Sequence, residues 1–366
     1  MSQFKLRMQK QLQKQKQMQL QRQVQRGAAL LSAMLTVTLV ATLASAALWQ
    51  QFRSLEVETA ERGRLQSALI LTGALDWARL ILREDGRTGG ADHLAEPWAV
   101  PLEESRLSSF LAVDGQTSDL DRDAFLSGTI TDLQGRLNVA NLVDGSVNSE
   151  VGQASFQRLF ELLDLPPQAL AVLTENYLAA AKRSYQPPRS AASAASAPAA
   201  SGTASSSEFL LPQRTDQLAW LGLEADTLLI LEPYISVLPA RTPVNLNTAS
   251  AVVIAASTPG LDIAGAEKLI AARARKHFTT LAEANQSLGS AAVSFTEGQH
   301  SVATRFFEVR GQLRLDTLTV FERSLVQRDG RNVRTLWRAR GASVQADPAG
   351  LPTNSGASST GAINKP

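Results

Sequence analysis

RGAALLSAMLTVTLVATLASAALWQQ, residues 26–51, is the stretch of sequence that decides the fold. No charged side chain occurs between Ala28 and Gln51, and residues 28–49 are almost wholly apolar. A helix of about twenty such residues crosses the hydrocarbon core of a bilayer. The stretch therefore predicts one transmembrane helix over residues 28–49, with Trp49 at the membrane interface.

The charges on either side of this helix give it a direction. Residues 1–27 contain seven lysines and arginines and no acid, whereas the first acids, Glu56 and Glu58, follow the helix. Positive charge is retained on the cytoplasmic side of a membrane. We expect the amino terminus in the cytoplasm and the body of the chain outside it. Apolar residues at helical spacing between Leu65 and Ile81 indicate that the helix continues beyond the membrane.

A cleaved signal peptide is the competing interpretation. Ala44-Ser45-Ala46 places small residues at the spacing of a signal peptidase site, directly behind an apolar stretch. The basic leader is long for a signal peptide, however, and the apolar pattern runs on into an amphipathic helix. These two features favour a helix that stays in the membrane.

Composition excludes several classes of function. The 366 residues are 44% hydrophobic, carry a net charge of +2 and include no cysteine, which removes disulfides, thiolate metal sites and a cysteine nucleophile. The three histidines, His93, His277 and His300, lack metal-ligand spacing, and we expect each on the surface or in a loop. Because no catalytic arrangement of residues stands out, we predict neither enzyme activity nor a cofactor.

Strand patterns follow the long helix. Residues 128–142, GTITDLQGRLNVANL, alternate as a half-buried strand, with Gly135 where a tight turn favours positive φ. Alternating strands return from Phe306, and Asp329-Gly330 predicts a hairpin. The arginines of these last strands, between positions 323 and 340, are expected on a solvated sheet face. The pattern predicts an α+β fold, in which a long N-terminal transmembrane and amphipathic helix packs on an antiparallel sheet.

A large helical domain is predicted to interrupt the sheet. Residues 156–182 have helical periodicity broken by Pro166-Pro167, which fits two helices. Alanine, serine and proline dominate residues 187–207, a composition typical of a flexible loop. The predicted parts are a cytoplasmic leader that is cleaved (1–27), the transmembrane helix (28–49), the helix continuation with the first part of the sheet domain (50–150), the inserted helical domain with its loop (151–300), the last strands (301–340) and a disordered tail (341–366).

One segment of the helical domain raises the possibility of DNA binding. Residues 243–249, PVNLNTA, followed by Pro259-Gly260-Leu261, resemble a helix-hairpin-helix unit of the SAM-like type. The candidate phosphate contacts in such a unit are Gly260, Lys268 and Arg273. Asp262 stands where a phosphate-binding turn has its second glycine, and its charge repels phosphate. A structural use of the motif is therefore favoured over DNA binding.

Acidic residues give a weak signal for a metal. Asp119, Asp121 and Asp123 have the spacing that opens a calcium loop. Ala124 and Ile130 stand where such a loop needs glycine and glutamate. A solvated acidic turn is therefore favoured.

The residues before the apolar stretch resemble a prepilin peptidase site. There a basic leader is cut after glycine and the new terminus is N-methylated, and the matching residues are Gly27 and Ala28. Residues 73–78, 96–101 and 128–142 extend the resemblance along the chain. On these segments the chain resembles the K-type minor pseudopilins of bacterial type II secretion systems. Most pilin-like proteins have glutamate at the fifth mature position, and K-type proteins lack it, as does this chain with Ser32.

The resemblance implies a role at the tip of the pseudopilus, initiating or capping its assembly and supporting export of folded proteins across the outer membrane. It implies single-pass insertion in the bacterial inner membrane, with a periplasmic body. The implied partners are the I-type and J-type minor pseudopilins, the major pseudopilin, the inner-membrane secretion platform and the prepilin peptidase, with no nucleic acid.

The family can also hold calcium in an acidic stretch of the helical domain. The ligands are not matched here, since Glu175, Asn176 and Glu208 are the nearest oxygen donors. The alternative function is a membrane-tethered helix-hairpin-helix protein that binds DNA for uptake.

Overall fold

The computed structural model describes residues 2–107, 124–184, 210–289, 293–315 and 318–344. The chain forms two units, Met1–Gln66 and Ser67–Pro366. The loop predicted at 187–207, the acidic residues Asp119, Asp121 and Asp123, and the predicted tail from residue 345 onward all lie outside the described residues.

Helix α1 begins at Ser2 and ends at Thr88. From Leu30 it is long and apolar enough to cross a membrane, with a mean hydropathy of 1.9 over its most apolar window and none of that window buried. Hydroxyl groups on this stretch donate inside the helix, as Thr36 Oγ1 does to the carbonyl of Ala33 at 2.8 Å. A hydroxyl bonded in this way needs no water, which suits a helix surrounded by lipid.

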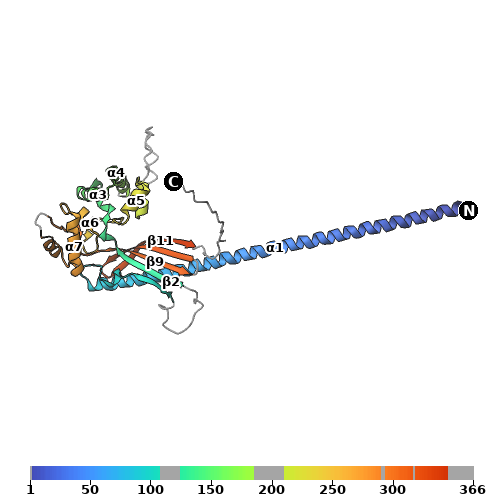
Figure 1. Cartoon of the computed structure of the whole chain (residues 1–366), viewed down its shortest axis with the longest axis horizontal. Helices are drawn as coiled ribbons and strands as arrows, with labels where there is room; N and C mark the ends of the chain where they lie inside the picture. Colours follow the sequence, from blue (N-terminus) through green and yellow to red (C-terminus); the bar gives the residue numbers. More distant parts are fainter. Residues whose placement is uncertain (1, 108–123, 185–209, 290–292, 316–317, 345–366) are drawn as a thin grey trace, which may run out of the picture. The chain divides into compact units, whose positions relative to one another are not determined.

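A five-stranded antiparallel sheet forms the centre of the second unit, in the order β1-β2-β9-β10-β11 (Figure 1). The last turns of α1 pack on one face of this sheet, where Leu75 and Leu82 are buried against Phe307 and Val326. The α+β fold with a long helix on an antiparallel sheet is confirmed. The strands are β1 (Leu102–Arg106), β2 (Ala124–Asp132), β9 (Phe306–Leu315), β10 (Leu318–Asp329) and β11 (Asn332–Val344).

Two details of the strands differ from the sequence prediction. Strand β11 continues to Val344, which pairs with Leu318, so residues 341–344 belong to the sheet and not to the tail. Gly135 ends a short 3₁₀ helix, η2 (Leu133–Gly135), and does not have positive φ. Glycine is needed there for space, because a Cβ would lie 2.9 Å from the hydroxyl oxygen of Thr248. The hairpin at Asp329-Gly330 is confirmed, with Gly330 at φ +57°.

The helical domain lies between β2 and β9 in the sequence, and its helices gather at one end of the sheet (Figure 1). Its first two helices separate at the Pro166-Pro167 pair, as predicted. The helices are α3 (Glu150–Leu162), α4 (Pro167–Ser184), α5 (Ala225–Leu231), α6 (Ala251–Ser257), α7 (Ile263–Arg275) and α8 (Leu281–Leu288), with 3₁₀ helices η1 (Pro97–Ala99), η3 (Val139–Leu142) and η5 (Thr215–Leu221).

This domain has its own hydrophobic core. Leu159, Leu173, Leu218 and Ile254 are fully buried in it. Each such side chain contributes about 2 kcal/mol by leaving water. The core also takes in apolar residues of the segment 137–143, which precedes α3. Short two-stranded pairings hold its segments together: β3 (Leu137–Asn138) with β6 (Ile235–Ser236), β4 (Val143–Asp144) with β5 (Val147–Asn148), and β7 (Val244–Asn245) with β8 (His300–Ser301).

Candidate functional site

The predicted processing site lies within helix α1. Gly27, Ala28 and Ser32 follow one another along its backbone. The side chain of Ser32 is exposed within the chain and stands at the start of the apolar stretch. Cleavage after Gly27 remains a prediction. The geometry shows that such a cut would leave a continuous apolar helix beginning at its new terminus.

The hairpin between α6 and α7 has the turn that the sequence predicts. Gly260 adopts φ +78°, a left-handed conformation that glycine enters without strain. The carboxylate of Asp262 caps α7 by accepting a hydrogen bond from the Gly265 amide at 2.8 Å. An anion bound at this helix terminus would compete with that carboxylate and be repelled by it.

The two basic candidates on α7 behave differently. Arg273 points inward and donates through Nη1 to the carbonyl of Leu246, and burial lowers its pKa to about 10. The side chain of Lys268 is exposed. Of these two candidates, only Lys268 therefore presents its charge to solvent, while Arg273 is held by the backbone.

The first asparagine motif, Asn138 with Asn141, joins η3 to a loop about a hundred positions further along the chain. Asn138 Oδ1 accepts from the amides of Ala140 (3.0 Å) and Leu238 (3.1 Å). Asn141 Oδ1 accepts from the Thr242 amide (3.0 Å), and its Nδ2 donates to the carbonyl of the same residue (2.8 Å). A side-chain amide is suited to this task because it offers a donor and an acceptor together.

The second asparagine motif, Asn245 with Asn247, works in the same way. Asn247 exchanges both kinds of hydrogen bond with the backbone of Phe278, at 2.9 Å each. Asn245 donates to the carboxylate of Asp132 at 2.9 Å and to the carbonyl of Asp92 at 3.1 Å. The two asparagine motifs therefore join segments that are distant in the sequence, and we call them the asparagine clamps.

Asp132 is the centre of the junction between the sheet and the helical domain. It ends β2, is 5% exposed, and accepts from Gln134, Asn245, Thr248 and Thr304 at distances of 2.6–2.9 Å. Burial raises its pKa, while the hydrogen bonds favour the charged form. Four donors from three segments therefore converge on one buried carboxyl group, which holds η2, the segment 245–248 and Thr304 together.

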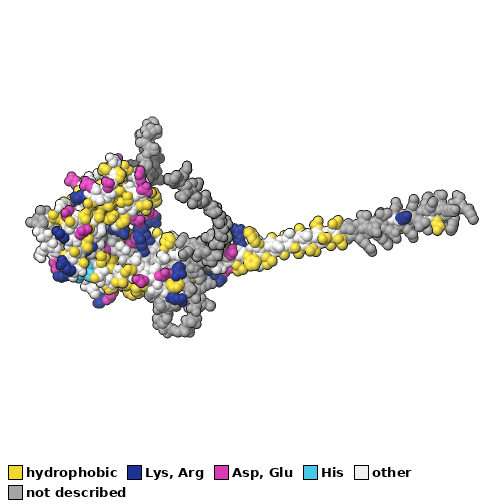
Figure 2. Space-filling model, viewed as in Figure 1, with side chains coloured by type: hydrophobic (Ala, Val, Ile, Leu, Met, Phe, Trp, Pro, Cys, Tyr) yellow, Lys and Arg dark blue, Asp and Glu magenta, His cyan; other side chains and the backbone are white. Residues whose placement is uncertain are grey.

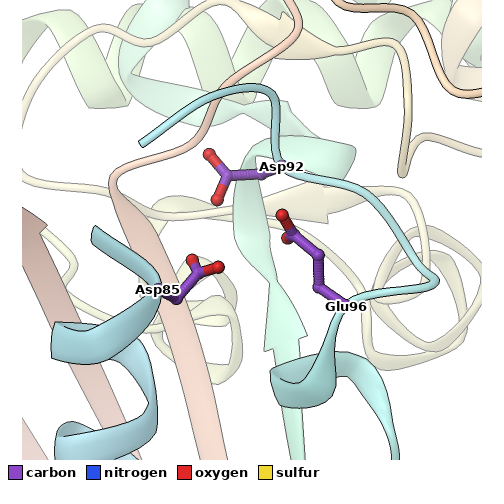
Figure 3. Close-up of side chains that lie close together, drawn as sticks. All are labelled: Asp85, Asp92 and Glu96. Carbon is purple, nitrogen blue, oxygen red and sulfur yellow. The ribbon is translucent and has the colours of Figure 1, made fainter. Parts of the chain in front are cut away.

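Three other carboxyl groups converge where α1 ends. Figure 3 shows Asp85, Asp92 and Glu96 pointing toward one another, and their oxygen atoms lie within 4.8 Å. Such a group is chemically able to hold a hard cation. The guanidinium of Arg328 on β10 already contacts both Asp85 and Asp92. The group therefore has a counter-charge from the chain itself, and it ties the end of α1 to the sheet.

Protonation adds a second means of relieving repulsion among these acids. Burial, with smaller contributions from neighbouring Asp85 and Asp92, raises the pKa of Glu96 to about 7. Burial also raises the pKa of Asp85. His93 lies beside Glu96 and stacks on His277 with ring centroids 3.7 Å apart. Burial and His277 lower the pKa of His93.

Two expectations about charged residues are wrong. Arg328 is 8% exposed and does not lie on a solvated face, because its two carboxylate partners offset the cost of burial. His300 is 1% exposed and is not a loop residue at the surface. Its Nδ1 accepts from the Thr296 amide at 3.3 Å, which places the proton of the neutral ring on Nε2, toward Thr258 at 3.1 Å.

The neighbourhood in which the resemblance implies calcium does not present a matching ligand set among the described residues. Asn176 donates its side-chain amide to the carbonyl of Leu221 at 2.9 Å. Among the described residues, the acidic group whose ligand atoms lie close enough together for a metal is Asp85, Asp92 and Glu96, outside this neighbourhood. Calcium binding stays a prediction of the resemblance.

Two family models described as type II secretion system protein K match this chain, one over residues 135–240 and the other over residues 244–303. These ranges contain both asparagine clamps. The chain is also 28% identical over 250 residues to the type II secretion system protein K of Pseudomonas aeruginosa, across 65% of this chain and 69% of that protein. These matches confirm the resemblance to type II secretion system protein K that the sequence predicts.

A solved structure supports the protein K fold. A chain from the crystal structure of the GspK-GspI-GspJ complex of the enterotoxigenic Escherichia coli type 2 secretion system matches with a TM-score of 0.54. The match covers 78% of this chain and 99% of that chain at 18% identity, so it shows a shared fold. The family models and the Pseudomonas aeruginosa relative, together with this shared fold, support the identification of this chain as a minor pseudopilin of type II secretion with an apolar N-terminal helix.

Sequence reasoning missed the ion-pair group of Asp85, Asp92 and Arg328. Arg328 is 243 positions from Asp85 and 236 positions from Asp92, and no local sequence pattern relates it to them. The available signal is the position of Arg328 in β10. The residues before it, Val326 and Gln327, point to opposite faces of the strand, and both are buried. Such a strand is covered on both sides, and a charge within it needs a partner.

Proposed function

We propose that this protein K is the tip subunit of a type II secretion pseudopilus, which initiates or caps the filament and supports export of folded proteins across the outer membrane. It is a single-pass protein of the bacterial inner membrane, with its amino terminus in the cytoplasm and its body in the periplasm. The prepilin peptidase cuts after Gly27, and Ala28 becomes the N-methylated terminus.

Ser32 is the observation that carries this proposal. It stands at the fifth position of the proposed mature chain, inside a helix that has no charged residue between Ala28 and Gln51. A charge at this depth of a bilayer costs a few kcal/mol unless a partner offsets it. The resemblance implies that the glutamate of other pilin-like proteins pairs with the terminal amine of the neighbouring subunit as a subunit joins the filament. A subunit with no other subunit above it has no use for that charge, and serine avoids the cost. The chain would therefore start a filament and not extend one.

The proposed partners follow from this position. The solved relative is described as a complex of GspK with GspI and GspJ. By analogy, the I-type and J-type minor pseudopilins would contact this chain at the tip, the major pseudopilin would follow below them, and the inner-membrane platform would drive assembly. The function requires no catalysis by this chain.

Mass spectrometry of the amino terminus tests the proposal. The protein would be purified from membranes of cells with and without prepilin peptidase. A peptidase-dependent, methylated start at Ala28 is expected. A start near Ala47 in both strains would mean ordinary signal cleavage and release from the membrane, and it would remove the filament mechanism.

DNA uptake is the less favoured alternative. The Asp262 cap and the inward direction of Arg273 both weigh against a phosphate site on the hairpin. Duplex binding that weakens steeply with salt would support the alternative, because it reports release of counterions from DNA.

A further inference from the structure

The sheet has a second face, opposite the one that packs on α1. Alternation along the strands places Glu308 and Arg310 of β9 on this face, opposite Leu325 and Arg323 of β10. The same face continues to Phe321, whose exposed fraction is 48%. The strand beyond places small residues beside the arginine and the ring, since Ala339 is paired with Arg323 and Gly341 with Phe321, whereas Trp337 is paired with Leu325. The result is an open surface with two arginines beside an exposed aromatic ring.

The two arginines form a like-charge pair across the strands. Arg310 and Arg323 are direct partners in the β9–β10 ladder, an arrangement that destabilises a sheet. Glu308 offsets it: Arg323 Nε lies 2.6 Å from one carboxylate oxygen, and Arg310 contacts the other. Glu308 is 1% exposed. One buried carboxylate therefore serves two guanidinium groups.

A third arginine joins them from the helical domain. Arg136 donates through Nη1 to the carbonyl of Glu232 at 3.2 Å, and among the described residues it forms no ion pair within 4.0 Å. Burial lowers its pKa, and Arg310 and Arg323 act in the same direction, whereas Glu308 and Glu232 oppose them. The Glu232 carboxylate lies 3.7 Å from Arg323. Three guanidinium groups thus face two carboxylates, which leaves one positive charge uncompensated in this group of described residues.

We propose that Arg136, Arg310 and Arg323 form a docking site for one carboxylate side chain of a partner protein, with Phe321 as the adjacent apolar contact. The planar fork of arginine fits a carboxylate with two hydrogen bonds, and arginine and aromatic residues dominate the energetic centres of protein interfaces. Figure 2 shows basic side chains gathered where the strands meet the helical domain. A nucleic acid needs many such charges in a row, whereas this group has an excess of one.

The first test uses glutarate as a probe that mimics an acidic side chain. Thermal unfolding of the full chain in uncharged detergent would be followed during titration with glutarate, with sodium chloride holding the ionic strength constant. A saturable rise of about 2 °C in Tm is expected. Arg310→Gln should abolish most of this rise. The matched control is Arg314→Gln on the same strand and face, where Arg314 has its own carboxylate, Glu104, at 2.7 Å.

Equal responses of the two variants would overturn the proposal, as would a rise with inorganic phosphate that exceeds the rise with glutarate. A second test places a photo-crosslinking phenylalanine analogue at Phe321 in cells. The captured partner segment should contain Asp or Glu, and the loss of capture in Arg310→Glu should be reversed when that acid is changed to arginine. Capture that ignores these charges would refute the site. Neither test depends on processing at Gly27, so failure here would leave the secretion role intact.

Discussion

Replacement of His300 should change how the stability of the helical domain depends on pH. Burial lowers the pKa of His300 to about 4, from an ordinary value of 6.5. Below pH 6.5 the unfolded chain takes up a proton at this residue that the folded chain refuses. Stability from this group is therefore complete above pH 6.5 and is lost as the pH falls toward 4. At about 1.4 kcal/mol per pH unit, the loss amounts to about 3 kcal/mol.

The His300→Gln variant isolates this contribution, because glutamine does not titrate and keeps a donor near Thr258. Urea unfolding of the full chain in detergent, followed by circular dichroism, would be compared for wild type and variant between pH 7 and pH 4. The comparison is needed because Glu96, whose pKa is raised to about 7, makes stability fall with rising pH from about 4.5 to 7.

The difference in unfolding free energy between the two proteins should change by about 3 kcal/mol across this range in favour of the variant at low pH. The His277→Gln variant serves as a control, because it removes a different histidine and keeps the buried ring of His300. A difference that stays constant within about 1 kcal/mol would show that His300 is not held neutral by burial, and the reasoning would fail.

Four further predictions follow from the same contacts. Gly152→Ala should destabilise the helical domain by about 2 kcal/mol in urea unfolding, because its Cβ would lie 1.9 Å from the carbonyl of Asn141, whereas Gly73→Ala, which has open space, should cost nothing. Asp132→Asn should cost about 3 kcal/mol by the same assay, since an amide group cannot accept all four hydrogen bonds, and a wild-type midpoint would contradict this account of the junction. Ser32→Glu should alter pseudopilus length or reduce secretion, and unchanged values of both would count against the proposed role of this position. A gel-shift titration should detect no salt-dependent duplex binding by the full chain, and a steep salt dependence would favour the DNA alternative.

The sequence was sufficient wherever local pattern determines structure. The uncharged stretch after Gly27 predicts the membrane helix, the Pro166-Pro167 pair separates α3 from α4, and Asp329-Gly330 closes the β10–β11 hairpin. In each case the deciding interactions are within a few residues. The end of β11 was placed too early because its last pairings depend on β10 and not on the residues themselves.

The junction could not be predicted in the same way. Arg328 and His300 look like ordinary surface residues until distant segments enclose them. Gly135 looked like a turn glycine, but the reason for glycine is the approach of Thr248 from more than a hundred positions away. The candidate function, by contrast, depended on Gly27, Ala28 and Ser32, whose meaning comes from the resemblance to the family and not from contacts.

The pairing of β2 with β9 has a consequence for the order of folding. Asp132 pairs with Phe307, so the whole helical domain separates two neighbouring strands in the sequence. Closing so large a loop is slow, while the helical domain relies on contacts nearer in sequence. The helical domain would therefore form before the β2–β9 pairing. Until it brings β9 back, the edge of β2 remains unpaired and is exposed to aggregation.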